Sequence, residues 1–297
     1  MLKKPKLLHV LPSLDAGGTE LGILNLYLGG FYKDFDIEIL SLVKGSSPAT
    51  LQSYRSAFAE QQITILSHKN NIGYQDLPFL FSNFLRQLNR IKPDVLVLSL
   101  PKSVIMGTLA AFLNPALVVI SFEHMGRRYG YKLAMLMKCI THRINFYFGD
   151  CRQTIDTARE IYPPSTPAYE VPLIQIKSTF HAPDAVKPQC YKIMSMGRFT
   201  EQKNYIELVH AVYLLKQKNY DIHLTLVGNG PQDRLLKKIV NNLGLTEQVA
   251  FPGHITAIER DDMLRATHIY VQPSLYEGQC LSVIEAMAAG KIVVATD

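Results

Sequence analysis

The chain has 297 residues, of which 47% are hydrophobic and 19% are charged, and its formal net charge is +6 at pH 7. This composition excludes an intrinsically disordered chain, and the length leaves room for two domains. The sequence has four cysteines, Cys139, Cys151, Cys190 and Cys280, and they form no C-x-x-C pair. This spacing argues against a zinc site, and we expect the thiols to be reduced.

Apolar strands alternate with helices along residues 1–175. The strands are predicted at residues 6–11, 37–43, 63–66, 95–98, 117–122 and 144–148, and the helices at 20–29, 76–91, 103–113, 132–141 and 151–161. Strands that are apolar throughout indicate a parallel sheet that is buried on both faces. Prolines and polar residues interrupt the start of the chain, and the longest apolar runs are too short to span a bilayer, so we expect a cytoplasmic protein.

Prolines cluster after this first half, at Pro163, Pro164, Pro167, Pro172, Pro183 and Pro188. They predict a boundary near residues 175–188, with one domain over residues 1–175 and a second over 188–297. In the second domain, strands are predicted at residues 191–196, 222–227, 249–251, 269–272 and 291–295, and helices at 204–218, 232–243 and 257–265 and after residue 280.

The stretch over residues 274–290 carries the strongest chemical pattern. Glu277 lies in a loop after an apolar strand, and Glu285 lies on the helix that follows. Carboxylates accept hydrogen bonds from sugar hydroxyls, and the amides at a helix start favour a phosphate. The amides expected to do so belong to Gly278, Gln279, Cys280, Leu281 and Ser282. Either glutamate alone is more typical of a solvated face, but together they indicate a sugar nucleotide.

Four other sites lie where a strand of a parallel sheet ends, the edge at which open α/β sheets bind ligands. Arg198 and Lys203 could bind a diphosphate, although an isolated basic pair is equally typical of solvated side chains. Gly17 with Gly18 allows a phosphate to approach a helix start, although an isolated glycine pair is more often part of a plain turn. His124 and His254 follow two further strands, where a histidine is either a ligand contact or a satisfied structural residue.

The 274–290 stretch resembles the E-x7-E signature of the retaining family-4 glycosyltransferases, of the glycosyltransferase group 1 type, which have the GT-B fold. Arg198 and Lys203 resemble the phosphate clamp of that family, and Gly17–Gly18 resembles its glycine pair. The segment that ends at His254 is similar to the one whose backbone meets the nucleotide base. His124 is similar to the histidine of the first domain that lies beside the sugar and the acceptor.

The resemblance implies two doubly wound, parallel-sheet, Rossmann-like domains that face a cleft, with the acceptor on the side of the first domain and the donor on the second. It implies transfer of a sugar from a UDP- or GDP-sugar to a lipid-linked or polysaccharide acceptor, with retained configuration and no required metal. Glu277 and His124 would be catalytic. Arg198, Lys203 and the helix start would hold the diphosphate, and Glu285 the ribose. The family continues for several tens of residues beyond Asp297, so the second domain is expected to be truncated.

The segment over residues 125–143 has five lysines and arginines and no acid. Its positive charge equals the net positive charge of the whole first half, residues 1–175. Arg127, Arg128 and Lys132, interleaved with apolar residues, favour a face toward an acceptor or an anionic membrane, as in a peripheral protein of cell-envelope polysaccharide synthesis. The alternative is a buried helix stripe with a solvated basic face. Nucleic acid is disfavoured because the basic charge is local and no nucleic-acid motif accompanies it.

Two alternative functions share this architecture. One is a truncated, non-catalytic protein that binds sugar nucleotides, and the other is a nucleotide-sugar epimerase. A metal-dependent glycosyltransferase of another fold is disfavoured because the D-x-D pair, Asp34 and Asp36, precedes a strand and does not follow one. An NAD-dependent oxidoreductase is disfavoured because neither glycine-rich loop fits G-x-G-x-x-G.

Overall fold

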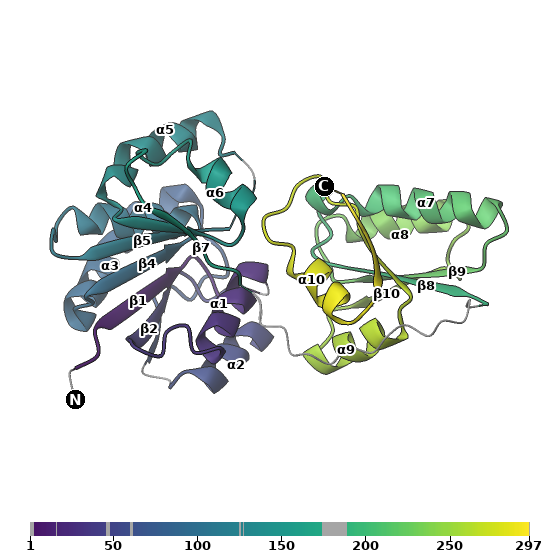
Figure 1. Cartoon of the computed structure of the whole chain (residues 1–297), viewed down its shortest axis with the longest axis horizontal. Helices are drawn as coiled ribbons and strands as arrows, with labels where there is room; N and C mark the ends of the chain where they lie inside the picture. Colours follow the sequence, from purple (N-terminus) through teal and green to yellow (C-terminus); the bar gives the residue numbers. More distant parts are fainter. Residues whose placement is uncertain are drawn as a thin grey trace. The chain divides into compact units, whose positions relative to one another are not determined.

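The computed structural model describes residues 3–15, 17–45, 48–59, 62–124, 126, 128–173 and 189–296. The chain divides into two compact units, Met1–Gln175 and Ile176–Asp297. Each unit holds one parallel sheet with helices packed on it (Figure 1). The predicted boundary at residues 175–188 lies outside the described residues.

The first unit is built on a sheet of seven strands in the order β3-β2-β1-β4-β5-β6-β7, and every neighbouring pair is parallel. The strands are β1 (Lys6–Leu11), β2 (Asp36–Ser41), β3 (Ile63–Ile65), β4 (Val95–Ser99), β5 (Val118–Glu123), β6 (Phe146–Gly149) and β7 (Ala168–Glu170). The α-helices are α1 (Gly18–Leu28), α2 (Pro48–Ala57), α3 (Leu77–Ile91), α4 (Pro101–Ala111), α5 (Tyr131–Ile140) and α6 (Arg152–Ala158), with 3-10 turns η2 (Tyr74–Asp76) and η3 (Thr141–Arg143).

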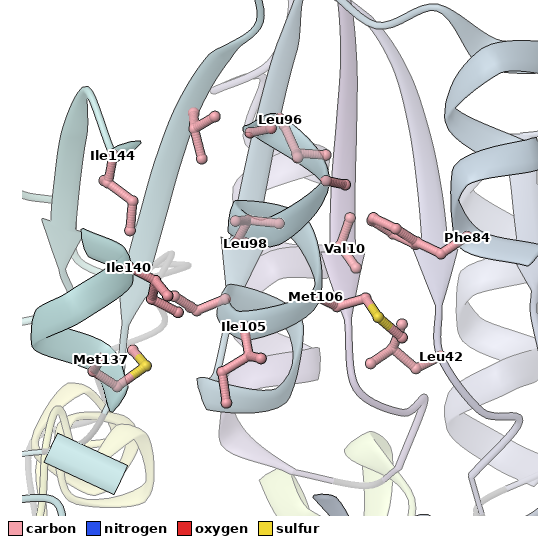
Figure 2. Packing of buried hydrophobic residues seen from close by; sticks show 14 of the residues in the cluster. Val10, Leu42, Phe84, Leu96, Leu98, Ile105, Met106, Met137, Ile140 and Ile144 are labelled. Atoms are coloured by element: carbon pink, nitrogen blue, oxygen red, sulfur yellow. The ribbon is translucent and has the colours of Figure 1, made fainter. Parts of the chain in front are cut away.

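Helix α4 lies over the centre of this sheet. Its Ile105 and Met106 pack against Leu96 and Leu98 of β4, and Phe84 of α3 completes the cluster beside them (Figure 2). The neighbouring strand residues, such as Val97, point to the opposite face and are buried as well. Because both faces of the central strands are covered, those strands must be apolar throughout, which is the pattern that the sequence shows.

The second unit has five parallel strands in the order β10-β9-β8-β11-β12. The strands are β8 (Tyr191–Met196), β9 (Ile222–Val227), β10 (Val249–Gly253), β11 (Ile269–Gln272) and β12 (Ile292–Ala295). The helices are α7 (Tyr205–Gln217), α8 (Asp233–Asn242), α9 (Ala257–Ala266) and α10 (Leu281–Ala288), with the 3-10 turn η4 (Glu201–Lys203) before α7.

Alternate residues of β8 supply two separate cores, one on each face of the second sheet. Ile193 belongs to the core beneath α7 and α8, whereas Met194 and Met196 belong to the core that Leu264 of α9 and Ala286 of α10 close. Figure 1 shows α7 and α8 on one side of this sheet and α9 and α10 on the other. The period of two along the strand therefore produces the doubly wound arrangement.

The predicted fold class, two doubly wound parallel α/β domains, is confirmed, while the cleft between them stays a prediction. Two elements were not predicted: α2 and β7. Helix α2 is rich in serine, threonine and glutamine, but it is anchored by Tyr54, which is fully buried and donates a hydrogen bond to the Glu20 carbonyl at 2.7 Å. Tertiary packing thus overrides a weak local preference.

Replacing Phe84 by alanine is expected to lower the free energy of unfolding by about 3–5 kcal/mol, because a fully buried ring leaves a cavity. Phe79 lies on the same helix but is 84% exposed. Phe79→Ala should therefore change the free energy of unfolding by less than about 0.5 kcal/mol. Urea unfolding followed by circular dichroism measures both, and equal losses in the two variants would contradict this packing.

Candidate functional site

The strand order of the second sheet reverses between β8 and β11, so the chain leaves these two neighbouring strands toward opposite sides. Such a switch point is where open α/β sheets bind ligands. The loops after the two strands are joined by hydrogen bonds: the Leu275 amide donates to the Gln202 carbonyl at 2.8 Å, and the Gln202 side chain donates to the Tyr276 carbonyl at 2.9 Å. Residues far apart in sequence are thereby placed at one edge.

Lys203 and Glu277 form an ion pair at this edge. The Lys203 Nζ atom lies 2.5 Å from Glu277 Oε1, and the Ser274 hydroxyl donates to the same oxygen at 2.6 Å. The two charged side chains are 17% and 23% exposed, so each is half-buried and still reachable. Two residues that the sequence assigns to donor binding are therefore in direct contact, although 74 positions separate them.

A series of buried side chains, linked by hydrogen bonds, orients Glu277. The Met196 amide of β8 donates to the Tyr270 hydroxyl at 3.1 Å, and that hydroxyl donates to Gln272 Oε1 at 2.9 Å. The Gln272 amide then donates to Ser274 Oγ at 2.9 Å, which in turn bonds Glu277. Tyr270, Gln272 and Ser274 were not predicted as site residues. The available signal was a polar residue at the end of an apolar strand.

Glu285 also has a cationic partner, Arg260 of α9. Arg260 Nη1 lies 2.9 Å from Glu285 Oε1, and Arg260 also contacts Asp261. Burial raises the pKa of the Glu285 carboxyl, the Arg260 charge opposes that rise, and the Asp261 charge adds to it. Arg260 was missed from the sequence because an arginine on a charged helix is normally a solvated residue.

Helix α10 begins at Leu281, with Cys280 as its N-cap, which agrees with the helix predicted after residue 280. Gly278, Gln279 and Cys280 lie in the loop before the helix, so the first helical amides are those of Leu281 and Ser282. All five residues are half-buried. Burial raises the pKa of the Cys280 thiol, and the Glu277 charge adds to it, so this thiol is kept protonated.

Arg198 and His254 are both exposed, in the loops after β8 and β10. The loop between them, after β9, holds the strand ends together, because the Gly228 amide donates to the Gly253 carbonyl at 2.9 Å. Gly228 has φ +124°, and a Cβ atom there would lie 2.1 Å from the Gly197 carbonyl oxygen. A side chain at Gly228 would thus push apart the loops that carry Arg198 and His254.

In the first unit, Gly17 and Gly18 lie at the start of α1, directly after the loop that follows β1. Gly17 is the N-cap, and Gly18 is the first helical residue and is exposed. The helix therefore begins two residues before the predicted start at Glu20. The glycine pair occupies a helix N-terminus at the carboxyl edge of the sheet, which is the position that its predicted role requires.

His124 follows the last residue of β5, and its side chain is only 2% exposed. Its Nε2 atom lies 3.1 Å from the Ser99 hydroxyl, and its Nδ1 atom lies 3.7 Å from Asp150 Oδ2. The ring also packs on Phe122, with centroids 4.4 Å apart. Both ring nitrogens thus face protein groups, and the predicted place of His124 beside a sugar stays a prediction.

The three basic residues predicted as an acceptor or membrane face have different surroundings. Arg127 lies outside the described residues. Arg128 forms an ion pair with Glu160 at 2.6 Å. The basic segment over residues 125–143 therefore has an acidic partner that lies outside the segment. Lys132 is exposed on α5, next to the exposed Tyr131. In the described part of the chain, no helix has the length and apolar character needed to cross a membrane.

Solved structures share the fold of the two units over nearly the whole chain. HepE of Anabaena, solved in complex with UDP and glucose, gives a TM-score of 0.75 at 15% identity, over 98% of this chain and 80% of that chain. Sucrose-phosphate synthase from Thermosynechococcus elongatus gives a TM-score of 0.76 at 17% identity, over 98% and 81%. At such identities the likeness establishes the fold.

Sequence relatives match over shorter segments. Mannosylfructose-phosphate synthase of Agrobacterium fabrum is 30% identical over 112 residues, which are 35% of this chain and 25% of that protein. The 2-deoxystreptamine glucosyltransferase of Streptomyces kanamyceticus is 28% identical over 148 residues, which are 50% of this chain and 38% of that protein. The matched segments thus span about a quarter to two fifths of these relatives.

The family described as "Glycosyl transferases group 1" matches residues 177–297. The match covers the loop of Lys203, the loop of Glu277 and the helix of Glu285, which are the parts brought together at the switch point. The second unit therefore matches the group 1 glycosyltransferases, and the two units have the GT-B fold that the solved structures share.

Proposed function

We propose that the protein transfers a sugar from a UDP- or GDP-sugar to a lipid-linked or polysaccharide acceptor, with retained anomeric configuration. The observation that carries the proposal is the Lys203–Glu277 pair, 2.5 Å apart at the switch point of the second sheet. A cation and a carboxylate side by side match a ligand that carries phosphate next to sugar hydroxyls. HepE, which shares the fold, was solved with UDP and with glucose.

In this proposal positive groups stabilise the leaving diphosphate. Lys203 exchanges its ion pair with Glu277 for one with a phosphate oxygen. The planar guanidinium of Arg198 donates further hydrogen bonds, and the amides at the start of α10 contribute a partial positive charge. Charge on the diphosphate grows as the glycosidic bond breaks, so these groups bind the transition state more tightly than the ground state. The proposed reaction needs no metal ion.

The carboxylates hold hydroxyl groups of the donor. The two hydrogen bonds that Glu277 accepts from described residues, from Lys203 and Ser274, both end on Oε1, so we assign Oε2 to hydroxyls of the transferred sugar. Glu285 holds the ribose hydroxyls, and the loop at His254 meets the base. Gly17 and Gly18 face the diphosphate from the first unit, and His124 steadies the sugar or the acceptor. Retention then proceeds without a covalent glycosyl-enzyme, because Glu277 serves as a hydrogen-bond partner and not as a nucleophile.

We also propose that α5 faces an anionic membrane that presents the acceptor, on the cytoplasmic side. Its exposed residues combine apolar and basic side chains: Tyr131, Lys132, Met135, Leu136 and Lys138. Such a helix can bury its apolar residues at a membrane surface while its lysines meet anionic headgroups. Among the relatives is the lipopolysaccharide core biosynthesis glycosyltransferase LpsE of Rhizobium meliloti, 34% identical over 107 residues.

Lys203→Ala and Glu285→Ala are each expected to weaken binding of the donor at least about tenfold, because a hydrogen bond to a charged group contributes about 1.5–3 kcal/mol. Isothermal titration calorimetry with UDP-glucose and GDP-mannose identifies the donor and measures the loss. Lys218→Ala is the matched control, since Lys218 is exposed at the opposite end of α7 from Lys203. Unchanged affinity in both test variants would rule out the proposed donor site.

Mass spectrometry of the wild-type protein with the donor separates the alternatives. Transfer to an acceptor, or slow donor hydrolysis, supports the transferase. Donor binding without either reaction indicates a non-catalytic binding protein. Release of the nucleotide diphosphate together with an epimerised sugar, in the absence of any acceptor, indicates an epimerase, and proton NMR distinguishes that sugar from the unepimerised sugar of equal mass. Either of the last two results would overturn the proposed transfer.

Arg260→Gln and Asp261→Asn are expected to shift the pKa of Glu285 in opposite directions. The first removes the charge that lowers this pKa, and the second removes one that raises it. Protonation removes the carboxylate that accepts ribose hydroxyls, so donor affinity falls as pH drops through this pKa. The fall should begin at higher pH in Arg260→Gln and at lower pH in Asp261→Asn.

Donor affinity measured from about pH 4 to pH 7 tests this pair, a range that brackets a carboxyl whose pKa is raised. The two variants serve as controls for each other because they alter neighbouring residues of one exposed helix. Profiles that shift in the same direction, or that do not shift at all, would show that Arg260 does not keep Glu285 ionised.

Replacing Lys132 and Lys138 together by glutamate should abolish most binding to vesicles that contain phosphatidylglycerol, because each basic residue near such a surface contributes about 1 kcal/mol. Co-sedimentation measures the bound fraction. The control exchanges the exposed Lys218 and Lys238 of the second unit for glutamate, which makes the same change in net charge. Equal binding of the two variants, or equal binding of the wild type to neutral vesicles, would contradict the membrane face.

A further inference from the structure

Three buried polar side chains form a row that runs from the interior of β1 to the carboxyl ends of β4 and β5. His9 of β1 and Ser99 of β4 are both fully buried, and His124 follows β5. The Ser99 hydroxyl lies 2.8 Å from His9 Nε2 and 3.1 Å from His124 Nε2, so it links the two rings. The far nitrogen of His9 lies 3.1 Å from the Tyr32 hydroxyl. The far nitrogen of His124 faces Asp150.

His9 is neutral, because its pKa is lowered to about 3, mainly by burial. A neutral imidazole carries a single N–H, so one ring nitrogen donates and the other accepts. The Ser99 hydroxyl also has one proton, so when it donates to one ring it can only accept from the other. The row can therefore run in two opposite directions, and the groups at its ends decide between them.

The contact between His124 and Asp150 determines which nitrogen of His124 carries a proton. His124 Nδ1 is buried and has no hydrogen-bond partner among the described residues, and it lies 3.7 Å from Asp150 Oδ2. A bare nitrogen lone pair against a carboxylate oxygen is repulsive, whereas an N–H is attracted to it. A neutral His124 therefore carries its proton on Nδ1, and its Nε2 accepts from Ser99.

The contact between Tyr32 and His9 favours the same direction of hydrogen bonding along the row. With Ser99 donating to His124, Ser99 accepts from His9 Nε2–H, and His9 Nδ1 is left as an acceptor. The Tyr32 hydroxyl, which is buried, then donates its proton to that nitrogen. In the reverse direction, the Tyr32 proton would have no acceptor among the described residues. An unpaired buried donor costs about 1–3 kcal/mol, so both ends favour one direction.

We propose that Tyr32, His9, Ser99 and Asp150 are positioning residues that fix His124 as the neutral Nδ1–H tautomer. The row runs Tyr32 O–H to His9 Nδ1, His9 Nε2–H to Ser99 Oγ, and Ser99 O–H to His124 Nε2, with His124 Nδ1–H toward Asp150. This rests on the proposed function only for the place of His124 beside the transferred sugar. There the row would supply a neutral, preoriented ring instead of a mobile cation.

Long-range proton–nitrogen NMR of the full chain, labelled at histidine and free of ligand, tests the proposal directly. The two histidines should have opposite tautomers at neutral pH, with His9 protonated on Nε2 and His124 on Nδ1. The signals are assigned with His9→Gln and His124→Gln. His124 protonated on Nε2, or His9 on Nδ1, would overturn the proposal, and neither result bears on whether the protein transfers sugars.

Asp150→Asn tests the coupling along the row. The Thr154 hydroxyl donates to Asp150 Oδ1 at 2.7 Å, so an asparagine that keeps this bond turns its NH2 group toward His124 Nδ1. His124 should then become Nε2–H, and because Ser99 has one proton, His9 should become Nδ1–H. Inversion of His124 without His9 would show that the two rings are not coupled, and no inversion would show that Asp150 does not set the direction.

Asp156→Asn is the matched control, since Asp156 is an exposed aspartate of the same helix region that pairs with Arg152 and Arg159. It should leave both tautomers unchanged. With the donor identified, Asp150→Asn should also lower kcat for transfer about tenfold or more while leaving the donor KM unchanged, because the ring is misprotonated but the donor site is intact. An unchanged kcat with inverted tautomers would remove the role in transfer and leave the row as a structural feature.

Discussion

The reversal of strand order in the second sheet is the constraint on which the candidate site depends. Strands β8 and β11 are neighbours and parallel, but the chain crosses from each to a different face of the sheet. Their following loops must therefore diverge around a common edge, and the bond from the Leu275 amide to the Gln202 carbonyl fixes how they meet. The Lys203–Glu277 pair is a consequence of that topology, not of sequence proximity. The first sheet reverses between β1 and β4, where Gly17 and Ser99 lie.

Each carboxylate of the E-x7-E stretch is neutralised by a cation from another element, Glu277 by Lys203 and Glu285 by Arg260. A half-buried carboxylate without a partner would be costly, so the pairs make the ligand-free protein stable. The pairs are also exchangeable, since each remains partly exposed. In the proposed function, a diphosphate replaces Glu277 as the partner of Lys203, which leaves the carboxylate for hydroxyl groups. Lys203 thereby keeps an anionic partner, and the Glu277 carboxylate keeps hydrogen-bond donors.

Much of this could be predicted from the sequence, and the gaps have physical reasons. The bounds of β8, β9 and β11 follow from short apolar runs between turn residues, and Lys203, Glu277 and Glu285 follow from motif spacing. Arg260 could not be found, because its partner lies 25 positions away and only packing of α9 beside α10 joins them. His9 and Ser99 lie within apolar strands, where a polar residue has no local pattern that reveals its partner. Their pairing, 90 positions apart, exists only once β1 and β4 are neighbours.

The two units use polar side chains in different physical regimes. In the first unit, His9, Ser99 and Glu123 are almost completely buried and bonded to one another or to tyrosines; Glu123 accepts from Ser121, Tyr129 and Tyr162. A buried and satisfied network is rigid, because moving any member leaves another without a partner. In the second unit the charged pairs are half-exposed and can be exchanged. The polar groups of the first unit are therefore held in a fixed buried network, whereas those of the second unit remain free to change partners.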